Sequence, residues 1–123
     1  MATRSFKELI VWQKAHSFVL NVYKFAQSFP KDEMYGLTSQ FKRAAVSIAG
    51  NIAEGYAKKS LADKLKFFNI SQGSLEECEY YIVLSRDLEF ISKEQEKVLD
   101  SLSDEIGKLL QSYMKKMQSS KNS

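Results

Sequence analysis

Polar side chains suited to hydrogen bonding recur every three or four residues in the run YGLTSQFKRAAVSIAGNIAEGY, which spans residues 35–56. This polar row consists of Gln40, Arg43, Ser47, Asn51 and Glu54. Amides, a forked guanidinium and a hydroxyl suit contacts inside a helix bundle better than the Lys and Glu of an ordinary exposed face. We expect a structural polar network that also includes Glu76 and Glu79, with Arg43 paired to one of these two carboxylates. A pocket for a ligand or partner is the alternative.

Basic residues beside aromatic ones form the second group with chemical meaning. The net charge is only +3, but positive charge gathers around the second turn, whereas acidic residues gather between Glu76 and Glu89. Lysines next to Tyr56, Phe67 and Phe68 suit single-stranded nucleic acid, through phosphate contacts and base stacking. The expected nucleic-acid-binding residues are Lys42, Arg43, Lys58, Lys59, Lys64 and Lys66. The alternative is an ordinary solvated basic end of the molecule.

Signatures of catalysis and of cofactor binding are absent from the sequence. One histidine, His16, and one cysteine, Cys78, are too few for the usual four-ligand zinc site. Neither glycine-rich phosphate-binding pattern occurs. We therefore expect no catalytic residue, no metal, no cofactor and no enzymatic activity. A single cysteine and the lack of a signal peptide or a membrane span lead us to expect a cytoplasmic protein with no membrane partner.

Helical spacing of apolar residues predicts one all-α domain over residues 1–123. Short connections predict an antiparallel, up-down-up-down four-helix bundle. Pro30 ends the first helix, Gly55 is read as a C-cap with positive φ, and Ser60 and the Ser92–Gln95 capping box begin the last two helices. The polar tail QSSKNS is expected to fray. The helices are predicted at about residues 7–27, 36–56, 60–88 and 93–117.

The first helix has more apolar surface than one bundle seam needs. One row runs from Val11 through Phe18 to Phe29, and a second row lies beside it. A large exposed apolar face is unusual in a monomer, so we interpret the second row as the interface of a homo-oligomer. A wider internal core is the alternative. The expected interface residues are Leu9, Trp12, Val19 and Tyr23.

Three long segments carry a family resemblance: FKELIVWQKAHSFVLNVYKFAQSFP, YGLTSQFKRAAVSIAGNIAEGY and FFNISQGSLEECEYYIVLSRDL. They resemble the 23S ribosomal RNA intervening-sequence protein family over about residues 6–115, and the AAVS…NIAEG run is the most specific part. These are bacterial four-helix-bundle proteins, some of them encoded in sequences inserted within 23S rRNA genes. The chain departs from the family at Ala49-Gly50, where the family often has Pro followed by a small residue.

The resemblance implies a homopentameric barrel of four-helix bundles. It also implies similarity to the accessory protein of diversity-generating retroelements, a basic pentamer that binds nucleic acid and a reverse transcriptase. Our leading hypothesis is a non-enzymatic, oligomeric, RNA-associated nucleic-acid-binding protein. A scaffold that docks a partner such as a nucleic-acid enzyme is the alternative. A third hypothesis, an enzyme, requires a pocket with an unpaired polar group near Arg43, Asn51 and Glu54.

Overall fold

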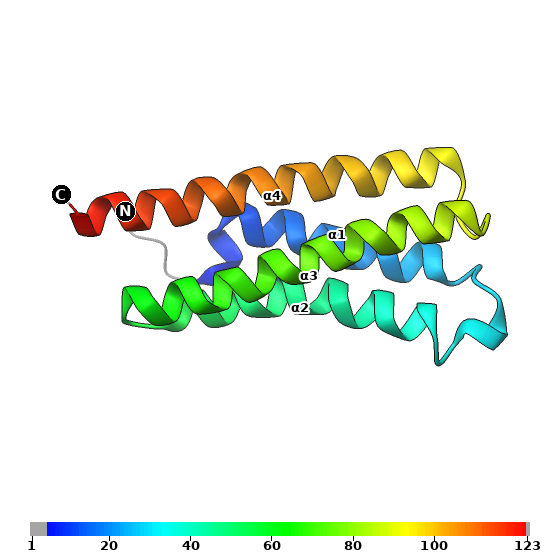
Figure 1. The fold of residues 1–123 in the computed structure, drawn as a ribbon, viewed down its shortest axis with the longest axis horizontal. Helices are drawn as coiled ribbons and strands as arrows, with labels where there is room; N and C mark the ends of the chain where they lie inside the picture. Colours follow the sequence, from blue (N-terminus) through cyan, green and yellow to red (C-terminus); the bar gives the residue numbers. More distant parts are fainter. Residues whose placement is uncertain (1–4, 123) are drawn as a thin grey trace.

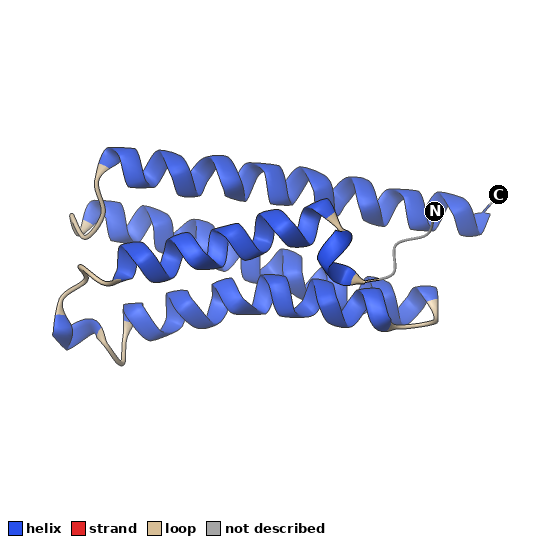
Figure 2. Cartoon of the chain, turned by 180° about the vertical axis from the view of Figure 1, so that it is seen from behind, coloured by secondary structure: helices blue, strands red, loops and turns tan. Residues whose placement is uncertain are grey.

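Four long α-helices lie side by side and make up most of the chain (Figure 1). The computed structural model describes residues 5–122, with side chains through Ser119. Short loops join successive helices at alternate ends of the molecule, and Figure 2 shows no strand among the described residues. The all-α class is therefore confirmed. The elements are η1 (Phe6–Glu8), α1 (Ile10–Ala26), η2 (Lys31–Glu33), α2 (Leu37–Ala57), α3 (Leu61–Asp87) and α4 (Lys93–Asn122).

Side-chain caps set where α3 and α4 begin. The Oγ of Ser60 accepts the backbone N–H of Asp63 at 3.1 Å. At the start of α4, the Oγ of Ser92 accepts the N–H of Gln95 at 3.1 Å, and the Oε1 of Gln95 accepts the N–H of Ser92 at 2.9 Å. This reciprocal pair is the predicted capping box, which satisfies two backbone donors that have no partner inside the helix.

Two helix ends differ from the prediction. α1 begins at Ile10 rather than at residue 7, because a 3₁₀ turn precedes it and Leu9 has extended backbone angles. α4 continues through Asn122, so residues 118–122, which we expected to fray, are helical. No Gly or Pro occurs there to end the helix. Ser123 lies outside the described residues.

Gly55 is not the predicted C-cap. α2 runs on through Ala57, and no described glycine has a positive φ. A Cβ atom on residue 55 would lie 2.9 Å from Cε1 of Phe68, closer than real Cβ atoms come to a neighbour. Gly55 is therefore required by the close approach of α3 to α2, and not by its backbone angles.

The two apolar rows of α1 have different surroundings. Val11, Phe18 and the rest of the first row through Phe29 are buried, apart from Phe25, which is half-buried. The second row lies at the rim of the core, where Leu9, Trp12 and Val19 are half-buried and pack against it, and Tyr23 is 43% exposed. None of the helices in the described part of the chain combines the length and the apolar character needed to cross a membrane.

Candidate nucleic-acid interface and its supporting polar network

Hydroxyl groups join α2 to α3. The Oγ of Ser74 donates to the Oγ of Ser47 at 2.7 Å, and the Nδ2 of Asn51 donates to the same Oγ at 3.0 Å and to the Ser47 carbonyl at 2.8 Å. The Oγ of Ser71 donates to the carbonyl of Ile48 at 2.6 Å. A serine reaches the backbone of a neighbouring helix only where the two helices are very close. These bonds therefore hold the register of α3 on α2.

Two more predicted members of the polar row also have partners. The Oη of Tyr81 donates to the Oε1 of Gln40 at 3.1 Å and also lies 3.2 Å from the Oε2 of Glu77. Burial, with the neighbouring carboxylate of Glu77, raises the pKa of the Tyr81 phenol above its usual value. The Oε2 of Glu54 lies 3.5 Å from the ammonium of Lys58, the C-cap residue of α2. The polar row is thus mainly occupied by contacts within the protein.

The expected pairing of Arg43 with Glu76 or Glu79 is wrong. The Oε2 of Glu79 accepts a hydrogen bond from the Oγ of Ser103 on α4 at 2.9 Å, so this carboxylate belongs to the α3–α4 seam. Arg43 is exposed and forms no ion pair with any residue in the range 5–119. The prediction failed because α3 turns its small residues, including Ser71 and Ser74, toward α2. Those serines were the sequence signal that we missed.

Arg43, Asn51 and Glu54 do not converge on one site. Asn51 turns toward Ser47, and Glu54 turns toward Lys58. Arg43 lines a shallow polar hollow of about 280 Å³ whose other walls include Gln40 and Tyr81. No group of three or more His, Cys, Asp or Glu residues in the described part of the chain is placed to hold a metal ion.

Two lysine ammonium groups flank the ring of Phe67 near the α2–α3 turn. The Nζ of Lys58 lies 5.0 Å from the ring centroid, and the Nζ of Lys66 lies 5.7 Å from it. Phe67 is half-buried, and Lys66 and the neighbouring Lys59 are exposed. We call Lys58, Lys59, Lys66 and Phe67 the basic platform. It combines a half-buried aromatic ring with ammonium groups that lie over it, residue types that are common on surfaces that bind a single strand.

Lys64 has a different role from its neighbours. Its ammonium donates hydrogen bonds to the carbonyls of Tyr56 at 2.8 Å and Gly55 at 3.3 Å. These carbonyls lie in the last turn of α2, and that of Gly55 also accepts the backbone N–H of the C-cap residue Lys58 at 3.3 Å. A cation at this end of a helix is also favoured by the helix dipole. Lys64 therefore caps α2, whereas the sequence had grouped it with the phosphate-binding lysines.

Lys42 and Arg43 lie apart from the basic platform. The Nζ of Lys42 lies 4.7 Å from the centroid of the Tyr23 ring on α1. The 16 residues from position 42 to position 58 (58 − 42 = 16) correspond to about 24 Å along the axis of α2. The six residues predicted to bind nucleic acid thus form two groups and not one surface: one group lies on α2, and the other lies at the α2–α3 turn and the start of α3.

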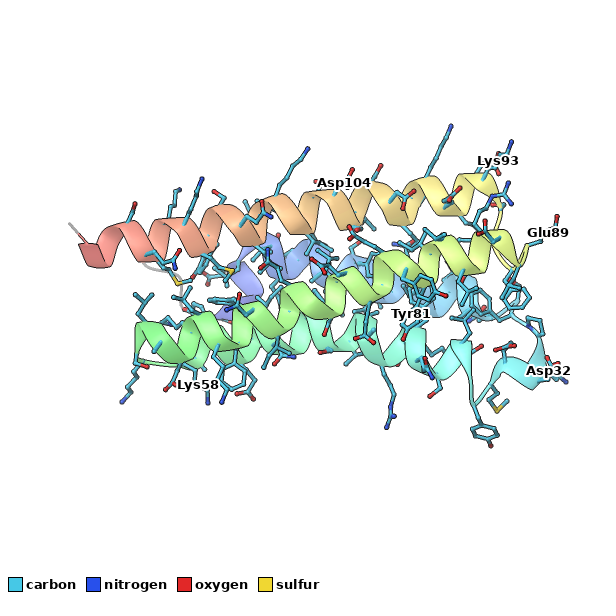
Figure 3. The ribbon with its side chains drawn as sticks, viewed as in Figure 1. Asp32, Lys58, Tyr81, Glu89, Lys93 and Asp104 are labelled. Carbon is cyan, nitrogen blue, oxygen red and sulfur yellow. The ribbon has the colours of Figure 1, made fainter. Side chains whose placement is uncertain are left out.

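Acidic residues lie together on α3 and α4. Burial raises the pKa of the Asp100 carboxyl, and the nearby carboxylates of Glu96, Asp104 and Glu79 raise it further. Figure 3 shows Lys58 near one end of the bundle, Asp104 further along α4 and Glu89 at the other end. Acidic residues therefore gather on α3 and α4, but Lys93 lies at the same end of the bundle as Glu89, so the two signs of charge are not separated by end.

An apolar groove of about 280 Å³ lies on the outside of α1 and α2. Two of the predicted interface residues, Trp12 and Val19, form part of it, and the ring of His16 stacks on Trp12 with their centroids 4.9 Å apart. The α2 wall has small or apolar residues at helical spacing, a sequence signal that our prediction of the interface did not use. We call this the α1–α2 groove, and its walls are Phe6, Trp12, His16, Val19, Val46, Ala49, Gly50 and Ala53.

Four helices around one apolar core, with the charged groups outside it, define an all-α helical-bundle protein whose chemistry lies on its surface. The chain belongs to the 23S rRNA-intervening sequence protein family, whose family model matches residues 7–112. This confirms the resemblance seen in the sequence. The chain is also similar to the crystal structure of a protein of unknown function from the S23 ribosomal protein family of Bacteroides thetaiotaomicron. The two are 29% identical with a TM-score of 0.79, over 86% of this chain and 96% of that one. No curated protein matches the chain.

Proposed function

We propose that this chain is a non-enzymatic, oligomeric, RNA-associated protein of the cytoplasm that binds a single strand on its basic platform. The observation that carries the proposal is the ring of Phe67 with the ammonium groups of Lys58 and Lys66 at 5.0 and 5.7 Å from its centroid. A base can replace the ammonium groups over such a ring, and the displaced lysines can then contact its phosphates. The family description, which names 23S rRNA, favours RNA over DNA.

The lysines near the α2–α3 turn divide into contact residues and a supporting residue. Lys59 and Lys66 are exposed and form no ion pair within residues 5–119, so their charges are available to phosphates. Lys58 is partly neutralised by Glu54 at 3.5 Å and contributes less. Lys64 holds the end of α2 in place beneath them.

The proposal includes a homopentamer, the assembly that the family resemblance implies. The α1–α2 groove supports it, because its walls are almost wholly apolar and open on the surface of the single chain. Burial of this groove against a second copy would remove apolar surface from water. Five copies would also multiply the few phosphate contacts that one basic platform can make.

Salt dependence of RNA binding tests the proposal. Fluorescence anisotropy with a labelled single-stranded RNA would give the affinity at several salt concentrations. The double variant Lys59→Glu/Lys66→Glu should bind more weakly, and its log–log slope against salt should fall by about 0.7 for each phosphate that the protein no longer neutralises. Phe67→Ala should weaken binding at every salt concentration and leave the slope unchanged, because it removes stacking and no charge.

A charge-matched control is available at the other end of the bundle, where Lys93 begins α4 (Figure 3). Lys93→Glu/Lys97→Glu changes the net charge by the same amount and should leave the slope almost unchanged. Equal effects of the two double variants would mean that only net charge matters, and the assignment of RNA binding to the basic platform would be wrong. A wild-type protein that binds no RNA even at low salt would refute the function itself.

A protein-docking scaffold is the second candidate, and one observation favours it. Tyr80 and Val83 are 60% and 52% exposed, one turn apart on the acidic part of α3 between Glu76 and Glu89. Apolar side chains in an acidic setting suit a partner with a basic, apolar face. Stoichiometric recovery of one protein after nuclease treatment, abolished in Tyr80→Glu, would support the scaffold. Recovery that disappears with the nuclease would count against it.

A further inference from the structure

A second groove lies between α3 and the C-terminal half of α4, and Phe67 is not among the residues that line it. Its volume is about 530 Å³, within the range of pockets that hold small organic groups. We call it the amide groove, because three primary amides and two ammonium groups line it. Its main residues are Gln72, Lys108, Gln111, Met114, Lys115 and Gln118.

The α4 wall of the amide groove alternates cations and amides. Lys108, Gln111, Lys115 and Gln118 follow one another at steps of three, four and three residues, so they share one face of the helix. The two lysines are two turns apart, about 10 Å along the axis. Neither forms an ion pair with a described residue, in contrast to Lys14, which pairs with Glu105 at 3.1 Å.

Gln72 supplies the α3 wall, at a position that would otherwise be apolar. It follows Leu65 and Phe68 and precedes Leu75 on the stripe that α3 turns toward the core and α4. Gln72 is half-buried, yet its amide makes no hydrogen bond with any described residue. At a helix seam, Leu would pack better than a half-buried amide that has no hydrogen-bond partner. Its donor and acceptor reach solvent in the groove, where a ligand can also meet them.

We propose that the amide groove binds a base of single-stranded RNA, and that it supplies base preference where the basic platform supplies general affinity. An amide can donate and accept at once, so it can read the edge of an unpaired base. Met114 provides an apolar, polarisable surface for the base itself. Lys108 and Lys115 bind the phosphates on either side. This inference rests on the proposed function, because it concerns how the same ligand is read.

Binding of four labelled RNA homopolymers tests the inference. The wild type should prefer one homopolymer, and Gln72→Leu/Gln111→Leu should reduce that preference by about 5- to 150-fold, the discrimination expected of one bidentate amide contact. The slope against salt should not change, because no charge is removed. Lys108→Gln/Lys115→Gln should lower the slope and leave the order of preference intact. Gln27→Leu, an exposed amide just after α1, is the matched control and should change nothing.

Leu at position 72 extends an apolar stripe, so the thermal midpoint of Gln72→Leu should stay the same or rise. An unchanged or higher midpoint would show that the variant folds.

Photocrosslinking with a 4-thiouridine-containing strand locates the bound base independently, and crosslinks should map to the peptide that contains Met114. Equal affinity of the wild type for all four homopolymers would overturn the inference. So would an unchanged preference in the double Leu variant, or crosslinks confined to Tyr56 and Phe67. In these cases general binding persists and the proposed function stands. A wild type that binds none of the four would instead refute both.

Discussion

Gly55 of α2 lies against the ring of Phe68 of α3, so close that a Cβ on residue 55 would come within 2.9 Å of Cε1 and 3.0 Å of Cζ. Phe68 is 1% exposed, and its ring meets that of Tyr113 on α4 edge-on, with centroids 5.3 Å apart. The ring has little freedom to move away. This contact lies directly beneath the turn that carries the basic platform, so it sets how α2 and α3 meet there.

Gly55→Ala should therefore destabilise the protein. Overpacking a rigid core typically costs about 1–3 kcal/mol, which outweighs the gain of about 1 kcal/mol in helix propensity. Gly73 in α3 is the matched control, because a Cβ there meets nothing within 4 Å. Gly73→Ala should stabilise by about 0.5–1 kcal/mol. Urea denaturation measures both, and equal effects of the two substitutions would show that Phe68 can yield.

Lys64→Met should destabilise the fold by about 1 kcal/mol, because the carbonyls of Gly55 and Tyr56 lose their charged donor. Methionine keeps most of the apolar stem and removes only the ammonium group. Lys59→Met is the control, since Lys59 is exposed and caps nothing, and its thermal midpoint should hardly change. If both substitutions leave stability alone but weaken RNA binding alike, Lys64 is a phosphate contact after all.

If the proposed oligomer forms through the α1–α2 groove, Gly50→Glu should break it without unfolding the subunit. Residue 50 lies in the α1–α2 groove, and a Cβ there meets nothing within 4 Å, so the single chain can accept a side chain. A carboxylate at the centre of an apolar interface would be buried without a partner. Size exclusion with light scattering should show smaller particles than for wild type and for Gly73→Glu. A wild-type monomer would refute the oligomer, and an unaffected variant would place the interface elsewhere.

Asp100→Asn should raise stability at neutral pH. Burial first, and then the carboxylates of Glu96, Asp104 and Glu79, raise the pKa of Asp100 in the folded state above its value of 3.8 for an unperturbed group. The folded protein thus holds this proton more tightly than the unfolded chain, so the ionised carboxylate opposes folding. That cost is present above the raised pKa and disappears as the pH falls to about 3.8.

The difference between Asp100→Asn and the wild type should accordingly be largest at pH 7 and vanish in acid. Chemical denaturation at several pH values measures it. Added salt should reduce the part that comes from the neighbouring carboxylates. A variant less stable than the wild type at pH 7 would contradict the assigned cause of the shift.

The sequence alone determined the four helices, the buried row of α1 and the starts of α3 and α4. Each of these depends on local spacing: apolar residues every three or four positions form one face, and a serine such as Ser92 with Gln95 three residues later satisfies the first free N–H groups. The lysines and aromatic residues of the basic platform were also visible, because Lys58, Lys66 and Phe67 are close in the chain and meet across a short turn.

Only the tertiary structure decided what individual polar side chains do. α3 has apolar residues around much of its circumference, so its sequence does not determine which face meets α2. Successive residues of α3 point about 100° apart around its axis. A shift of one residue therefore moves a side chain from the side that faces α2 to the side that faces α4. That is why Glu79 binds Ser103 and not Arg43, and why Gln72 opens onto the amide groove. Lys64 caps a helix while the ammonium of Lys66 lies over the ring of Phe67, because packing brings only Lys64 to the end of α2.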